Sequence, residues 1–146
     1  MARFVTGDEF SEIAGAIEQR FVDRRTSVLM RRLREPCIRV VVLTLYLIDA
    51  LAHNCGHALL LAFNNESFMQ QVAGVARKYH LSPTQAALGV PEDHESRQEA
   101  VSVCLELLSN WAEFFKARRA YYSNIVDMYE MLESEGIGKP GTAPVH

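Results

Sequence analysis

The chain has 146 residues, of which 49% are hydrophobic and 23% are charged, and its formal net charge is −3. These values are typical of a soluble domain that can bury a core, and they argue against disordered and fibrous proteins. The three cysteines, Cys37, Cys55 and Cys104, are an odd number at irregular spacing, which predicts reduced thiols in an intracellular protein rather than a secreted disulfide framework.

Helical periodicity starts near the N-terminus. Apolar residues recur there at intervals of three and four, at Phe10, Ile13, Ala14, Ile17 and Phe21. This spacing predicts one amphipathic helix over residues 8–22. A second helix follows, and Pro36 is expected to end or offset it.

The second helix is basic. Between residues 20 and 39, seven arginines stand against Asp23 and Glu35, which gives this stretch a charge of +5. Anionic lipid headgroups, nucleic acid or an acidic protein could bind it, and a solvated face paired with the acidic C-terminal half is the alternative. Nucleic acid is disfavoured, because the arginines lie beside apparent core residues rather than exposed aromatic residues. The candidate lipid-binding residues are Arg24, Arg25, Arg31, Arg32 and Arg34.

A run that is apolar almost all round covers residues 37–54. Its length and its Leu- and Ala-rich second half favour a helix over a strand, although the segment from Ile38 to Val42 is β-branched. Such a helix is expected to be buried on several sides and to be the central helix of the fold. Asp49 interrupts the apolar stretch, which is too short to span a bilayer, and the sequence shows no signal-peptide pattern.

Four further helices are predicted, at residues 57–63, 67–79, 94–116 and 117–135. A turn precedes the second of them, with an N-cap at Asn65 or Ser67. Residues 81–94 contain two prolines and a glycine and are expected to form a long loop with a short helical turn at 84–88. The result is an all-α domain of about seven helices, arranged as a bundle or a superhelix.

The segment HNCGH, residues 53–57, places two histidines around a cysteine. On one continuous helix His53 and His57 would share a face, as zinc ligands do, but Gly56 interrupts it and no further ligands lie nearby. A helix end is the better interpretation, with Asn54 bonding the backbone and Gly56 just past the last turn. No metal site is therefore predicted. Since no other catalytic or cofactor motif appears, we expect a binding module with no enzyme activity and no cofactor.

Three stretches together resemble the VHS domain, the N-terminal module of endosomal and Golgi sorting adaptors. LYLIDALAHNCGH resembles the signature of that family's fourth helix, and LLLAFNNESFMQQV resembles its continuation into a sixth helix that carries a phenylalanine. CLELLSNWAEFF and IVDMYEMLESEGI resemble the last two helices, and LMRRLREP is similar to the basic third helix and the proline that follows.

The resemblance implies a right-handed superhelix of seven to eight helices over residues 8–138, with a lead-in at 1–7 and a tail or linker stub at 139–146. Too few residues precede Asp8 for the family's usual first helix, and the loop of residues 81–94 is longer than usual. The implied protein is a monomeric, non-catalytic domain of a cytoplasmic adaptor that works at the surface of endosome or Golgi membranes.

The family's ubiquitin-binding members use a tryptophan at the start of the second helix and a leucine four residues later, helped by the fourth helix. Those positions fall on Phe10 and Ala14. Phe10 keeps an aromatic anchor, whereas alanine at 14 removes a contact worth about ten-fold or more in affinity. The resemblance therefore implies weak recognition of ubiquitin or ubiquitinated cargo through Phe10, Ile13, Ala14 and the adjoining fourth helix. A plain core role for Phe10 is the alternative.

Two other binding modes stay open. In the Golgi adaptors that read acidic-dileucine sorting peptides, basic residues line a groove between the sixth and eighth helices. Here a lysine of that groove falls on Asn124 and the basic readers are missing, although Met69, Val72 and Tyr79 are expected to line an apolar groove. This mode ranks below ubiquitin binding. The third mode is phosphoinositide binding through the arginines of the basic helix, and a scaffold without a ligand of its own is the remaining alternative.

Overall fold

The computed structural model describes residues 12, 20, 23–54 and 57–137. Within them the secondary structure is helical, with no strand, and the all-α prediction is confirmed. A helix over residues 23–33 comes first. The elements that follow are α2 (Ile38–Asn54), α3 (His57–Phe63), α4 (Glu66–Tyr79), α5 (Pro83–Ala87), α6 (His94–Phe115), the 3-10 turn η1 (Lys116–Arg118) and α7 (Ser123–Ser134). None of these helices is long and apolar enough to cross a membrane.

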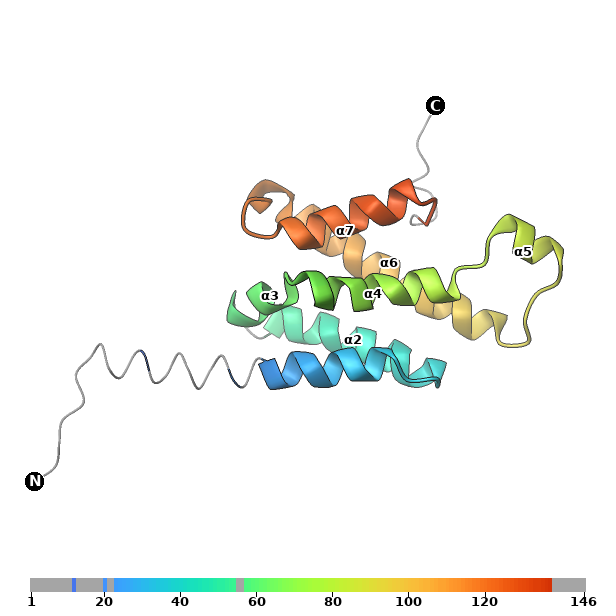
Figure 1. Ribbon diagram of the computed structural model, residues 1–146, viewed down its shortest axis with the longest axis horizontal. Helices are drawn as coiled ribbons and strands as arrows, with labels where there is room; N and C mark the ends of the chain where they lie inside the picture. The colour runs from blue at the N-terminus through green and yellow to red at the C-terminus, as the bar shows by residue number, and fades with distance from the viewer. Residues whose placement is uncertain (1–11, 13–19, 21–22, 55–56, 138–146) are drawn as a thin grey trace, which may run out of the picture.

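The helices stack in one direction, from the basic helix and α2 at one end, through α3, α4 and α6, to α7 at the other (Figure 1). The short α5 projects from the side of this stack. The helix α6 packs against α2, α4 and α7, so it is the central helix of the described fold. The prediction that the helix at 37–54 is central was therefore wrong: α2 buries one face only, and the reason is that no element of the described chain covers the other.

An aromatic cluster joins three of the helices. The ring of Phe63 stacks on Phe68, with 4.5 Å between centroids, and lies 5.7 Å from the ring of Trp111. The rings of Phe115 and Tyr122 also pack together, tilted by 31° and with centroids 4.1 Å apart. All of these side chains are buried. Aromatic pairs at these distances add about 0.5–1.5 kcal/mol each beyond the area they bury, so this cluster fixes α3 and α4 on the second half of α6.

The local sequence explains where α4 begins. The side chain of Asn65 accepts a hydrogen bond from the backbone N–H of Phe68 at 3.2 Å, so Asn65 is the N-cap and α4 begins one residue earlier than predicted. At the end of α2, Asn54 donates to the carbonyl oxygen of Ala50 at 2.7 Å, which confirms that Asn54 bonds the backbone of the last turn. Cys55 and Gly56 lie outside the described residues.

The end of the fold differs from the prediction. A single last helix was expected over 117–135, but α6 runs on into η1 and α7 begins only at Ser123. Its N-cap residue, Tyr122, makes no side-chain cap. Instead Asn64, in the turn between α3 and α4, accepts a hydrogen bond from the backbone N–H of Ile125 and donates to the carbonyl oxygen of Tyr121. The start of α7 is therefore defined by a residue about sixty positions away.

Candidate interaction surfaces

An apolar stripe lies exposed on α2. Leu43 and Leu47 are each 50% exposed and Tyr46 is 51% exposed. Ala50, one turn further, is also exposed. We call these four residues the α2 stripe. They share one face because positions three and four apart are neighbours on a helix, while the opposite face buries Val41, Val42, Thr44, Leu45 and Ile48.

Charged and polar groups border the α2 stripe. Arg39 stands at its N-terminal end and lies 3.9 Å from the carboxylate of Glu99 on α6. At the other end the imidazole of His53 lies 3.3 Å from the carboxylate of Asp49. A small hollow of about 140 Å³ between α2 and α6 is lined by Tyr46 and Asp49, among others. Exposed apolar side chains with a polar border are typical of an interaction surface.

Sequence reasoning missed this surface because residues 37–54 look apolar on every side. One signal was present: Arg39, Tyr46 and His53 are seven residues apart and therefore lie on one face of a helix. Arginine, tyrosine and histidine side chains carry polar groups that are best placed in water. Their shared face therefore indicates the side of α2 that stays exposed.

Beyond its C-terminal end, the α2 stripe leads to an aromatic hollow of about 600 Å³. Ala52 and His53 line it from α2, and Trp111 and Phe114 line it from α6. Trp111 is a buried part of the floor, whereas the ring of Phe114 is 70% exposed and contacts Phe115 edge to face. The hollow extends the apolar surface that a partner of α2 could cover.

The three residues predicted to bind ubiquitin, Phe10, Ile13 and Ala14, lie outside the described residues. The adjoining fourth helix of that prediction is α2, and the structure describes all of it. The exposed face of this helix carries the α2 stripe.

The predicted peptide groove is not open in this structure. Met69 and Val72 have no exposed surface and Tyr79 is only 5% exposed, because α4 turns this face toward α6 and α7. The amide of Asn124 donates to the backbone carbonyl oxygen of Asn64 at 3.2 Å. The expectation that Met69, Val72 and Tyr79 line an apolar groove is corrected: all three belong to the core.

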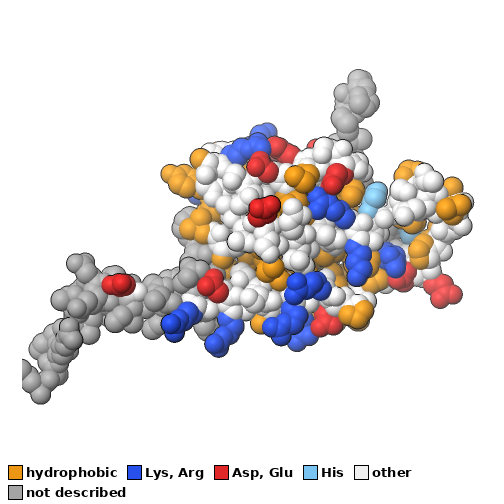
Figure 2. Space-filling view, in the orientation of Figure 1, with side chains coloured by type: hydrophobic (Ala, Val, Ile, Leu, Met, Phe, Trp, Pro, Cys, Tyr) orange, Lys and Arg blue, Asp and Glu red, His pale blue; other side chains and the backbone are white. Residues whose placement is uncertain are grey.

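The candidate lipid-binding arginines are exposed, at positions Arg24, Arg25, Arg31, Arg32 and Arg34. Lys and Arg side chains gather along the edge formed by the helix of residues 23–33 (Figure 2). The guanidinium of Arg32 pairs with the carboxylate of Glu35 at 3.0 Å. Leu29 and Leu33 on the same helix are buried, so this helix packs on the core while its arginine side chains stay exposed.

No group of three or more metal-binding side chains occurs among the described residues. The buried cysteine, Cys104, lies with its sulfur 3.0 Å from the carbonyl oxygen of Val72, and burial raises the pKa of its thiol to about 12. A thiol in this state is a poor nucleophile, so Cys104 is part of the packing of α4 against α6.

The model of the VHS domain family matches residues 11–136. Vacuolar protein sorting-associated protein 27 of Mycosarcoma maydis is 31% identical over 108 residues, which take in 74% of this chain and 10% of that protein. The chain thus spans about a tenth of the length of this relative, and no solved structure matches significantly. The chain belongs to the VHS domain family.

Proposed function

We propose that this VHS domain is the protein-interaction module of a vesicular-trafficking adaptor, and that it recognises ubiquitin or ubiquitinated cargo at the cytoplasmic surface of endosomes. The family and a relative named for vacuolar protein sorting support the adaptor role. The exposed α2 stripe is the structural observation that supports ubiquitin recognition.

The α2 stripe has the properties that a weak protein contact requires. Its leucines and its tyrosine keep half of their surface in water, so a partner that covers them buries apolar area that the fold itself leaves exposed. Covering the exposed half of one leucine contributes about 1 kcal/mol, half the value for complete burial. A few such residues must offset the entropy lost on association, so we expect weak binding, with a dissociation constant of about 0.1–1 mM.

An NMR titration of the ¹⁵N-labelled domain with mono-ubiquitin tests the proposal. Amide shifts are expected along the exposed face of α2, at residues 43–50, together with residues 8–17. Replacing Leu47 by alanine should weaken binding about five-fold, and replacing both Leu43 and Leu47 should weaken it about twenty-fold or more. These side chains are half exposed, so the variants are expected to fold normally.

The matched control is Leu88→Ala, since Leu88 is 87% exposed and lies beyond α5 on another part of the molecule. It should bind ubiquitin as the unchanged domain does. Absence of any shift at millimolar ubiquitin would refute the proposal, as would equal weakening by Leu47→Ala and Leu88→Ala.

A second function is supported by the exposed arginines of the helix at residues 23–33. Their charge would attract vesicles that contain phosphoinositides, with about 1 kcal/mol for each basic side chain near the surface. Vesicle pelleting should then require anionic lipid, fall with added salt and fall further in an Arg24→Gln/Arg31→Gln/Arg34→Gln variant. Equal pelleting with neutral vesicles would exclude this second function.

A further inference from the structure

The charged side chains along the contact between α2 and α6 are matched at one level and unmatched at the next. The two helices run side by side in the same direction, because their contacts occur in the same order along both of them. Near the start of α2, the guanidinium of Arg39 lies 3.9 Å from the carboxylate of Glu99. Tyr46 and Glu106 each come seven residues later, which is about two helical turns, and there α2 offers a phenol in place of a cation.

The small hollow beside Tyr46 contains this unmatched carboxylate. We call it the α2–α6 hollow, and its volume is about 140 Å³. It is lined by Tyr46, Asp49, Val103, Glu106, Leu107 and Asn110. No lysine or arginine lines it, and Glu106 forms no hydrogen bond or ion pair within the part of the chain that the structure describes. The carboxylate of Asp49 lies 3.3 Å from the imidazole of His53, which is a cation only when it is protonated. The hollow therefore has an excess of negative charge.

The size and the walls of the α2–α6 hollow suit one side chain. Sites for small molecules usually have volumes of about 300–1,000 Å³, so this hollow is too small for a typical free ligand. The ring of Tyr46 is 51% exposed and Val103 is half-buried, so both offer apolar surface next to the carboxylates. A divalent metal ion would find only two carboxylates here, because no group of three or more metal-binding side chains occurs among the described residues.

A guanidinium group matches this combination of carboxylates and an aromatic ring. It is planar and always protonated, it binds carboxylates with two parallel hydrogen bonds, and it stacks on aromatic rings. A tyrosine ring attracts such a cation when the two lie within about 6 Å of each other. The methylene groups of an arginine can also pack on Val103 while the charged end stays among polar groups. An ammonium group fits less well, because it is more strongly hydrated and cannot stack.

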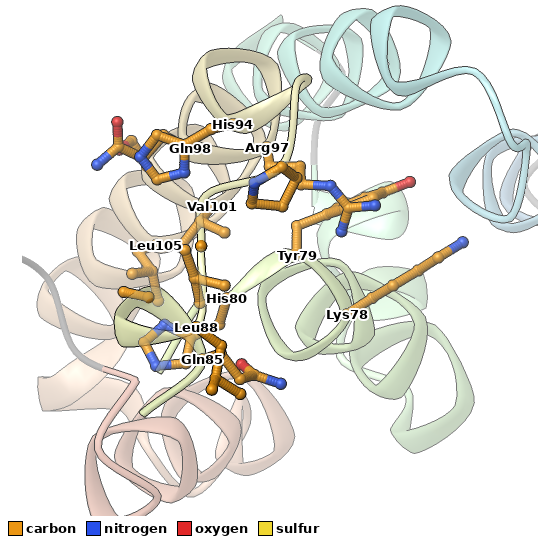
Figure 3. Close-up of a pocket in the computed structure, with 15 residues that line it drawn as sticks. Lys78, Tyr79, His80, Gln85, Leu88, His94, Arg97, Gln98, Val101 and Leu105 are labelled. Atoms are coloured by element: carbon orange, nitrogen blue, oxygen red, sulfur yellow. The ribbon is translucent and has the colours of Figure 1, made fainter. Parts of the chain in front are cut away.

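A larger hollow, where α4, α5 and α6 meet, shows how a site with matched charges differs (Figure 3). Its two cations already have partners. The Nε of Arg97 donates to the carboxylate of Asp93 at 2.8 Å, and the ammonium of Lys78 lies 5.3 Å from the centre of the Tyr79 ring. That ring is only 5% exposed. In the α2–α6 hollow, by contrast, the ring and the carboxylate of Glu106 are both open to a partner.

We propose that the α2–α6 hollow receives an arginine side chain of the protein that covers the α2 stripe, with the guanidinium on the carboxylates of Asp49 and Glu106 and beside the ring of Tyr46. Tyr46 belongs to the α2 stripe as well as to the hollow, so one partner surface covers both. The partner then carries an arginine next to its apolar patch, and this charge selects among proteins that would all fit the apolar stripe. The inference rests on the proposed function only in that a protein covers the α2 stripe.

The first experiment tests the hollow without ubiquitin. N-acetyl-arginine methylamide is titrated into the ¹⁵N-labelled domain, and the citrulline analogue, which has nearly the same shape but no charge, is the matched probe. The arginine derivative should bind with a dissociation constant of about 10–100 mM and shift the amides of residues 46, 49, 103 and 106. The citrulline analogue should leave these amides unchanged. Equal shifts with both compounds, or no shift at these residues, would overturn the proposal.

Two variants separate the hollow from the general negative charge of α6. Glu106→Gln should weaken binding of the arginine derivative about five-fold or more, because it removes the charge-assisted contact. The matched control is Glu95→Gln, which removes the same charge from the exposed first turn of α6 and should leave binding unchanged. Equal weakening by the two variants would show that the derivative follows net charge alone, which contradicts the proposal.

The second experiment connects the hollow with ubiquitin recognition. Glu106→Gln and Asp49→Asn should each weaken ubiquitin binding about five-fold, and Glu95→Gln should not. When the arginines of ubiquitin are replaced by glutamine one at a time, one variant should bind more weakly. Its combination with Glu106→Gln should weaken binding little further, because both changes remove the same contact.

Leu47→Ala distinguishes failure of this inference from failure of the proposed function. If Leu47→Ala weakens ubiquitin binding while Glu106→Gln and Asp49→Asn do not, the arginine contact is refuted and ubiquitin recognition stands. If ubiquitin does not bind at all, ubiquitin recognition fails, and the titration with the arginine derivative alone decides whether the hollow binds a guanidinium.

Discussion

The hydrogen bonds of Asn64 give the sharpest test of how this fold is held together. Its side chain donates to the carbonyl oxygen of Tyr121 at 2.8 Å and accepts from the backbone N–H of Ile125 at 3.2 Å. Ile125 is the third residue of α7, and its side chain is completely buried. Asn64 therefore does for α7 what an N-cap residue usually does for its own helix.

We expect Asn64→Ala to lower the free energy of unfolding by about 2 kcal/mol. Loss of a helix cap costs about 1 kcal/mol, and the N–H of Ile125, left without its acceptor, adds to that cost because it lies among buried residues. The carbonyl oxygen of Tyr121 adds less, because this residue is exposed and water can replace the amide. For a domain of this size the melting temperature should fall by about 6 °C.

Urea unfolding followed by circular dichroism measures this loss. The slope of the unfolding free energy against urea concentration should stay unchanged. The matched control is Asn65→Ala, which removes only the cap of α4 and should cost about 1 kcal/mol. Hydrogen exchange adds a local measurement, since the amide of Ile125 should lose protection in Asn64→Ala alone. If Asn64→Ala costs no more than Asn65→Ala, the reasoning that one side chain defines the start of α7 is refuted.

Three further predictions concern packing and charge. Phe63→Ala should lower the free energy of unfolding by about 4 kcal/mol, because it leaves a cavity between Phe68 and Trp111; a loss below 2 kcal/mol in urea unfolding would contradict the stacked cluster. In a Cys37→Ala/Cys55→Ala variant, the remaining thiol of Cys104 should react with a thiol reagent only as fast as the domain unfolds. Burial raises the pKa of this thiol from 9.0 to about 12, so its neutral form stabilises the fold fully below pH 9 and that stabilisation is lost as the pH rises toward 12. Arg119→Gln should change the melting temperature by less than about 2 °C, since its ion pairs with Asp127 and Glu130 are exposed, and a larger loss that vanishes in high salt would show that this network stabilises α7.

Much of this fold could be predicted from local sequence. Periodicity located the helices from α2 to α6, because a helix that packs on a core must carry apolar residues at intervals of three and four. The cap at Asn65 and the backbone bond of Asn54 follow from residues within four positions of each other. The motifs around residues 45–57 also pointed to the VHS family, which the comparison with known proteins confirmed.

Contacts between distant parts of the chain decided where α7 begins and which apolar faces stay exposed. The start of α7 was missed because its cap comes from Asn64, which no local pattern near Ser123 reveals. The same limit applies to function: Met69 and Leu47 are both apolar residues on helices, yet Met69 is buried against α6 while Leu47 is half exposed. Which apolar face becomes core depends on where neighbouring helices pack, and that is a property of the tertiary structure alone. The sequence by itself determined the family and the helices from α2 to α6, and the packing of α6 against α2, α4 and α7 decided which surfaces remain for a partner.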